Sequence, residues 1–192
     1  ATVPVCFHLD HGPSEMEAIR LLRWGATGIM YDGSVHPFEE NVSNTKHIVD
    51  ICDAINVGVE GELGHIGSVN DDEMEEFTDP QEAAEFVKRT GVCCLAVLIG
   101  NAHGHYKKTP KLDIDRVKAI REATGGTPLV LHGGSGIPDD QVKAAIKAGI
   151  RKMNIGTDLC CAFAEGKQKT LAEPHRRLAV DVFMKVAIES VK

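Results

Sequence analysis

The feature that most constrains this chain is the repeated alternation of short apolar runs with helical stretches. We expect six strands, at about 3–9, 28–31, 56–63, 93–99, 128–131 and 152–155. Helices are expected between them at about 14–24, 38–54, 80–89, 113–123 and 138–148, with more helical sequence beyond Asp158. Strands and helices that alternate in this way form parallel βαβ units. The strands are almost wholly apolar, which is typical of a sheet covered on both faces.

An open doubly wound sheet and a closed barrel both fit this alternation. Polar residues gather at the carboxyl ends of five or six strands, which favours an α/β fold of the (β/α)8 TIM-barrel type, because its site is built from all the βα loops. A full barrel needs about 250 residues, whereas the chain has 192. We therefore expect a single TIM-barrel domain over 1–192 that lacks roughly two βα units at its amino end. Either the chain is a fragment or those units are supplied separately.

Charge and hydropathy narrow the range of partners and compartments. The chain carries 21 basic and 28 acidic residues, for a net charge of −7, which disfavours nucleic-acid binding because phosphate backbones are held by clustered Lys and Arg. No apolar run approaches the roughly 18 residues of a membrane span, and no signal peptide is visible. The six cysteines form no C-x-x-C pair, so we expect reduced thiols in a cytoplasmic protein.

Three histidines, each followed by glycine, stand at the carboxyl ends of expected strands: His11, His103 and His132. In a barrel these positions converge on one mouth. Three neutral imidazoles that leave a fourth position open form a catalytic zinc site. A single histidine at a strand end is more often structural, but the repeated His-Gly pattern favours metal binding.

Carboxylates accompany these histidines at the same ends of the strands. Asp10 precedes His11 and is suited to general acid–base work on a substrate hydroxyl, or else to orienting an imidazole. Asp32 and Glu62 also end strands and are placed to bind a second or displaced metal position. Glu60 shares a strand face with Glu62, because side chains two residues apart point the same way. For these acids the structural and functional interpretations both stay open.

Two glycine-rich turns follow the last two expected strands, where barrels often hold phosphate. The turn at 133–136 precedes a helix, so its backbone N–H groups face the mouth, and the turn at 154–158 ends the next strand in a similar way. Lys107 is placed to add positive charge. The acidic loop from Gly64 to Asp79 is either a solvated surface loop or a mobile lid that carries a proton donor into the site.

Together these segments resemble the class II fructose-bisphosphate and tagatose-bisphosphate aldolase family. The matching stretches occur in family order over nearly the whole chain. They are VPVCFHLDHG (3–12), DGS (32–34) with PFEEN (37–41), VEGELG (59–64), IGNAHG (99–104) with YK (106–107), LVLHGGSGIP (129–138) and NIGTD (154–158). This combination is far more specific than any single motif.

The resemblance implies a role for each matched residue. The three histidines match the zinc ligands, Glu62 and Asp32 match alternative metal positions, and Asp10 matches the aspartate that handles the C4 hydroxyl of the substrate. The pocket for dihydroxyacetone phosphate is matched by Gly104, Lys107, Gly133, Ser135, Asn154 and Thr157, and Gly156 lies in the same turn.

The activity implied by the resemblance is reversible, zinc-dependent cleavage of a ketose 1,6-bisphosphate, most simply fructose 1,6-bisphosphate. The products would be dihydroxyacetone phosphate and glyceraldehyde 3-phosphate. Zinc would polarise the ketose carbonyl, and a loop acid would protonate the enediolate. The resemblance also implies a homodimer or homotetramer, and we add a monovalent cation as a further activator.

The chain departs from the family pattern in two places. The mobile loop reads GSVNDD (67–72) where the family usually has Gly-Gly and an acidic pair, so Asp71 is our expectation for the loop acid. The first two βα units, which contribute to the far phosphate site in the family, are missing from the expected barrel.

Other functions compete with this interpretation. Tagatose bisphosphate or another ketose phosphate is an alternative substrate, and a non-catalytic accessory subunit is an alternative role. A Schiff-base aldolase is disfavoured because Lys152 is expected at the start of its strand and Lys107 in a loop. A zinc hydrolase would usually have a His-x-His pair where this chain has His8-x-Asp10.

Overall fold

The computed structural model describes residues 2–66, 77–104, 106–172 and 180–191. Its described strands form one parallel sheet in chain order. They are β1 His8–Gly12, β2 Gly28–Tyr31, β3 Gly58–Leu63, β4 Cys94–Val97, β5 Leu129–Leu131 and β6 Ile150–Met153. The helices are α1 Glu15–Arg23, α2 Phe38–Asp53, α3 Pro80–Thr90, α4 Ile114–Ala123, α5 Asp139–Ala148, α6 Thr157–Ala172 and α7 Val180–Val191.

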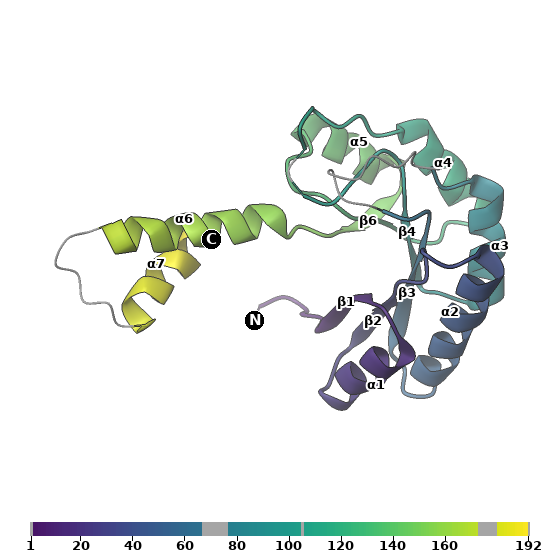
Figure 1. The fold of residues 1–192 in the computed structure, drawn as a ribbon. Helices are drawn as coiled ribbons and strands as arrows, with labels where there is room; N and C mark the ends of the chain where they lie inside the picture. Colours follow the sequence, from purple (N-terminus) through teal and green to yellow (C-terminus); the bar gives the residue numbers. More distant parts are fainter. Residues whose placement is uncertain (1, 67–76, 105, 173–179, 192) are drawn as a thin grey trace.

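The sheet curls, and α1 to α5 cover its outer, convex side (Figure 1). The described residues therefore form an α/β half-barrel of six parallel strands, as the alternation predicted, whereas closure into eight strands is not seen in them. Helices α6 and α7 pack against each other and extend away from the sheet (Figure 1). Among the described residues, no helix has the length and hydropathy of a membrane span.

The predicted bounds were wrong for the first and last strands. Strand β1 spans 8–12 rather than 3–9, because its pairing with β2 begins only at His8, opposite Gly28. Val3 and Val5 before it are mostly exposed. Strand β6 spans 150–153 rather than 152–155, because Ile150 already pairs with Leu129 of β5. In both cases the neighbouring strand, which the local sequence does not reveal, decides where the ladder begins.

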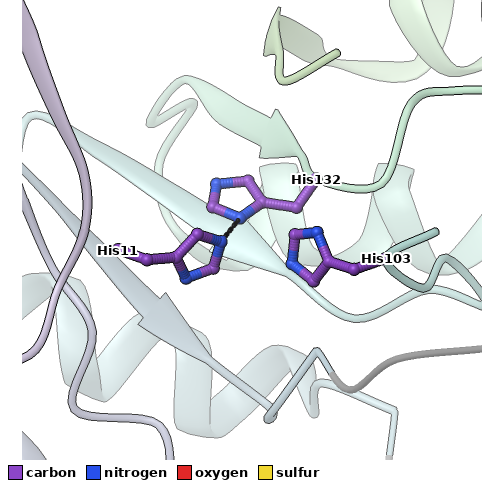
Figure 2. A group of neighbouring side chains, drawn as sticks. All are labelled: His11, His103 and His132. Carbon is purple, nitrogen blue, oxygen red and sulfur yellow. Dashed lines mark hydrogen bonds between the residues drawn. The ribbon is translucent and has the colours of Figure 1, made fainter. Parts of the chain in front are cut away.

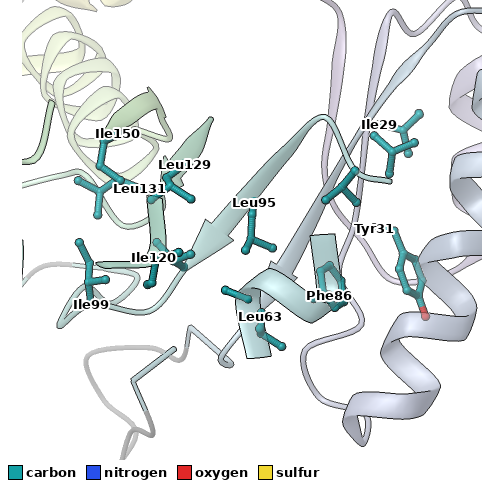
Figure 3. Packing of buried hydrophobic residues seen from close by; sticks show 14 of the residues in the cluster. Ile29, Tyr31, Leu63, Phe86, Leu95, Ile99, Ile120, Leu129, Leu131 and Ile150 are labelled. Carbon is teal, nitrogen blue, oxygen red and sulfur yellow. The ribbon is translucent and has the colours of Figure 1, made fainter. Parts of the chain in front are cut away.

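Side chains alternate between the two faces of the sheet, as strand geometry requires. The outward ones, such as Ile29, Leu95 and Leu129, form the main core with the helices (Figure 3). Full burial of each such side chain contributes roughly 1.5–3 kcal/mol. The inward apolar set is small and consists of Met30, Ala96 and Val130. The concave face is therefore left largely to polar residues.

N-cap side chains begin two of the helices that return the chain along the sheet. The Ser14 Oγ accepts the Glu17 N–H at 3.3 Å and so caps the start of α1. The Asp79 carboxylate caps α3 by accepting the N–H groups of Gln81 and Glu82 at 2.8 and 3.0 Å. Each helix then returns the chain to the amino end of the next strand, so that all carboxyl ends meet at one edge.

Candidate metal and phosphate site

The three strand-end histidines converge at the carboxyl edge of the sheet. Their ring centroids lie 4.7 Å apart for His11 and His132, 4.8 Å for His11 and His103, and 5.7 Å for His103 and His132. Figure 2 shows the rings pointing toward one another from three separate segments. One nitrogen from each ring lies within 4.8 Å of the others. This arrangement can hold one metal ion through three imidazoles.

Asp32 orients the imidazole of His11. The His11 Nδ1 lies 2.8 Å from the Asp32 Oδ2 and donates to it, which leaves Nε2 free to bind a metal. This hydrogen bond raises the pKa of His11 above its usual 6.5 against the effect of burial. Burial would raise the pKa of Asp32, but hydrogen bonds from His11 and Ser34 outweigh it and lower the pKa to about 2. Asp32 is therefore a carboxylate at neutral pH.

His132 is fully buried and makes contacts through both ring nitrogens. Its Nδ1 lies 2.9 Å from the His11 Nε2, on the side where the three rings meet. Its Nε2 lies 2.9 Å from the Glu60 Oε1. Burial would raise the pKa of Glu60, but the hydrogen bond from His132, the nearby His8 imidazole and the charge of Lys152 hold it well below its usual range. An ionised Glu60 accepts from the His132 Nε2–H, so Nδ1 keeps its lone pair.

His103 has no such acceptor among the residues that the structure describes. Its Nε2 is buried without a hydrogen-bond partner there, and burial followed by the nearby His11 lowers its pKa to about 4. The ring is therefore neutral at pH 7. A neutral, buried and unpartnered nitrogen beside two other imidazoles fits a metal ligand, because an unsatisfied polar atom is otherwise costly.

The Tyr106 hydroxyl links the segments that carry His103 and His132 through two hydrogen bonds. It accepts the Ala102 N–H at 2.9 Å and donates to the Gly133 carbonyl at 2.9 Å. Gly133 itself has φ +62, and a Cβ there would lie 2.1 Å from the Ala102 carbonyl oxygen. The two loops approach so closely that only glycine fits at this position.

Glu62 lies beside the histidines on β3 and offers a second metal position. It is buried, and its Oε1 accepts from Ser34 and Ile66 while its Oε2 has no hydrogen-bond partner among the described residues. Burial, together with the negative charge of Asp32, raises its pKa to about 8. His11, Asp32 and Glu62 form a second group whose ligand atoms lie within 4.8 Å of one another. The structure therefore brings both acids next to His11, and their role as metal ligands stays a prediction.

Asp10 lies at the exposed rim of the site. Its Oδ1 accepts from the Asn154 Nδ2 at 2.8 Å, and the Asn154 Nδ2 also lies 3.1 Å from the His132 Nε2. This carboxylate is therefore near the metal position yet open to a bound substrate. A general acid–base group needs both properties.

A cavity of about 380 Å³ opens over the histidines. It is lined by Asp10, His11, His103, Gly104, Gly133, Ser135, Asn154, Gly156 and Thr157, together with His8, Lys152 and Ile155. Helix α6 begins at Thr157, and a helix N-terminus attracts anions. The Ser135 Oγ accepts the Asp158 N–H at 3.1 Å and joins the two glycine-rich turns. Except for Lys107, the predicted phosphate residues thereby line one cavity.

Not every predicted site residue lines this cavity: His132, Asp32 and Glu62 are not among its lining residues, although each belongs to a candidate metal group. Lys107 is exposed and is not among its lining residues. Asp71, the expected loop acid, lies outside the described residues, as does most of the acidic segment around it.

Sequence reasoning assigned no role to Lys152 and left Glu60 undecided. The prediction that Lys152 begins its strand was wrong, because it is the third residue of β6. Its ammonium lies 2.8 Å from the Glu60 carboxylate and donates to the Asn154 Oδ1 at 2.7 Å. The spacing of Glu60 and Glu62 was a usable signal for the face of β3. No local signal could pair Glu60 with a lysine that is 92 positions later in the chain.

Comparisons with known proteins agree with this geometry. The model of the family described as fructose-bisphosphate aldolase class-II matches residues 1–192. A fructose-bisphosphate aldolase of Geobacillus stearothermophilus is 46% identical over 175 residues, which cover 90% of this chain and 61% of that protein. The chain therefore spans less than two thirds of the length of this relative.

Solved structures with the same fold are also aldolases by name. The YdjI aldolase from Escherichia coli K12 superposes with a TM-score of 0.84 at 41% identity, covering 100% of this chain and 68% of that one. A putative fructose-1,6-biphosphate aldolase from Coccidioides immitis gives a TM-score of 0.85 at 31% identity, again over 100% and 68% of the two chains.

Proposed function

Because the chain belongs to the class II fructose-bisphosphate aldolase family, we propose that it carries the metal site and one phosphate pocket of an aldolase. The substrate proposed is a ketose 1,6-bisphosphate, with fructose 1,6-bisphosphate first. The products are dihydroxyacetone phosphate and glyceraldehyde 3-phosphate. The observation that carries the proposal is the convergence of three imidazoles beneath a cavity that ends at a helix N-terminus.

The ligand set supports a zinc ion. His11 would bind through Nε2, because Asp32 holds the Nδ1 proton, and His132 through Nδ1, because Glu60 holds the Nε2 proton. His103 offers a neutral ring with an unpartnered buried nitrogen. Three nitrogen donors and an open fourth position are typical of catalytic zinc, and such an ion supplies Lewis-acid polarisation of a bound carbonyl.

The protein's own groups supply the remaining steps. The N–H groups at the start of α6 and the turn at Gly133 would bind one phosphate and fix the sugar along the cavity. Asp10, held by Asn154, would take the proton from the C4 hydroxyl as the C3–C4 bond breaks. The electron pair of that bond remains on the three-carbon fragment, and the other fragment leaves as an aldehyde. A loop acid, for which Asp71 is our expectation, would then protonate the three-carbon fragment to give dihydroxyacetone phosphate.

Aldol cleavage of fructose and tagatose 1,6-bisphosphates tests this proposal. We expect cleavage that a chelator abolishes and zinc restores, and the preferred epimer identifies the substrate. The Asp10→Asn variant should bind zinc normally but lose cleavage by about 10²–10⁴-fold. The matched control, Asp115→Asn, changes a carboxylate that is 91% exposed on α4 and should leave the rate unchanged.

The assay uses the chain as printed and the same chain joined to the part of the Geobacillus stearothermophilus relative that it does not match. If the joined, zinc-loaded protein cleaves neither sugar, the substrate assignment fails. Zinc binding without any turnover would then favour an accessory subunit.

A further inference from the structure

Glu60 lies beneath the three histidines on the concave face of the sheet, and its side chain is fully buried. Four groups surround its carboxylate. The His132 Nε2 lies at 2.9 Å, the Lys152 Nζ at 2.8 Å, the His8 Nε2 at 3.4 Å and the Cys94 Sγ at 3.7 Å. Glu60 belongs to neither group of candidate metal ligands. Burying a carboxylate is costly in free energy, and these four contacts offset part of that cost.

The contact with His132 decides which nitrogen of that ring can bind a metal. An imidazole that donates through Nε2 has its lone pair on Nδ1. The His132 Nδ1 is the atom that faces the His11 Nε2 at 2.9 Å. If Glu60 did not accept from Nε2, the neutral ring could carry its proton on Nδ1, and that proton would occupy the metal position.

The contact with Lys152 extends the arrangement to the rim of the site. The same ammonium donates to the Asn154 Oδ1 at 2.7 Å, which turns the amide so that its NH2 group faces away from Lys152. The Asn154 Nδ2 then donates to the Asp10 Oδ1 at 2.8 Å. A continuous series of polar contacts therefore runs from the buried Glu60 to the exposed Asp10.

We propose that Glu60 is a positioning residue: it holds His132 with Nδ1 toward the metal, and through Lys152 it keeps the Asn154 amide turned toward Asp10. This inference rests on the proposed aldolase function for its catalytic part only. The alternative is a charge pair that serves stability alone. Buried ion pairs are poor sources of stability, so the two roles predict different outcomes for the same variants.

Two substitutions of Glu60 separate the hydrogen bond from the charge. Glu60→Gln keeps an oxygen that can accept from the His132 Nε2–H, whereas Glu60→Met fills the same space without an acceptor. Zinc affinity is measured by competition with a chelator, and the geometry of the site by the visible absorption of bound Co2+. We expect Glu60→Met to weaken zinc binding by about 10–100-fold and to alter the Co2+ spectrum, and Glu60→Gln to lose less than about tenfold.

Lys152→Met tests the second half of the inference. It leaves the contact between Glu60 and His132 in place, so the Co2+ spectrum should keep the wild-type form. The value of kcat should fall while KM changes little, because Asn154 and Asp10 lose their orientation after substrate has bound. Cys94→Ala removes only the weakest contact of Glu60 and should leave all these readouts unchanged.

The outcomes distinguish this inference from the proposed function. Unchanged zinc affinity and Co2+ spectrum in Glu60→Met, with a lowered urea midpoint of the metal-free protein, would overturn the positioning role even if the wild type is an active aldolase. Equal losses in the Gln and Met variants would also overturn it, since the hydrogen bond would then not be the cause. Conversely, a wild type that binds zinc but cleaves no ketose phosphate would refute the function while the metal readouts still support the role of Glu60 toward His132.

Discussion

Replacing Gly133 with alanine tests the tightest approach between two segments of the site. The residue has φ +62, and an added Cβ would lie 2.1 Å from the Ala102 carbonyl oxygen and 2.6 Å from its carbon, well inside the 3.0 Å that real Cβ contacts keep. Neither partner can rotate away, because both are main-chain atoms. Tyr106 also ties the two segments together through hydrogen bonds to Ala102 and Gly133.

The expected cost has two parts. A left-handed backbone conformation costs a non-glycine residue roughly 1–2 kcal/mol, and forced overpacking adds roughly 1–3 kcal/mol. Gly133→Ala should therefore lower the free energy of unfolding by roughly 2–5 kcal/mol. Gly125→Ala is the matched control, because Gly125 has φ +67 but nothing within 4 Å of its would-be Cβ. Gly125→Ala should lower the free energy of unfolding only by the cost of the left-handed backbone conformation, roughly 1–2 kcal/mol.

Equilibrium urea unfolding of the metal-free protein gives both free energies from the midpoint and the slope. Zinc affinity should also fall in Gly133→Ala, by about 10–100-fold, because displacing Ala102 moves the adjacent His103. Gly125→Ala should leave zinc affinity unchanged. Equal losses of stability in the two variants, with normal zinc binding in both, would refute the argument that close packing of the two loops positions the histidines.

Three further predictions concern the metal site and the scaffold. Asp32→Asn should weaken zinc binding by about 10–100-fold. Zinc binds neutral imidazole, and Asp32 raises the pKa of His11, so the zinc affinity of the wild type should decline as the pH falls through that raised pKa. In the variant, the decline in zinc affinity should begin at a lower pH. Zinc titrations at several pH values check this, and an unshifted profile would count against the hydrogen bond to His11. Zinc at a hundredfold excess over its dissociation constant should stabilise the protein by about 2.7 kcal/mol. We expect a rise in Tm that a chelator reverses and that His103→Ala abolishes. The same rise in Tm in the His103→Ala variant would exclude His103 as a ligand. Asp79→Ala removes the N-cap of α3 and should cost about 0.5–2 kcal/mol in urea unfolding, with zinc affinity as the control that must not change.

The sequence alone was enough to predict the six parallel strands and the grouping of the strand-end histidines. Strands alternating with helices leave few topologies, and in a parallel sheet the carboxyl ends meet at one edge. His11, His103 and His132 could therefore be grouped before any distance was known. The glycine-rich turns at 133–136 and 154–158 were predicted in the same way, since both follow strands that are neighbours in the sheet.

The tertiary structure decided what depends on partners distant in sequence. The starts of β1 and β6 were mispredicted because pairing with the next strand, not local apolar character, determines where a ladder begins. Which ring nitrogen faces the metal position depends on Asp32 for His11 and on Glu60 for His132. Lys152 meets Glu60 only because the curled sheet brings β3 and β6 together across its concave face. Local periodicity encodes the direction in which a side chain points, but the identity of the group that it meets is set only when the strands assemble.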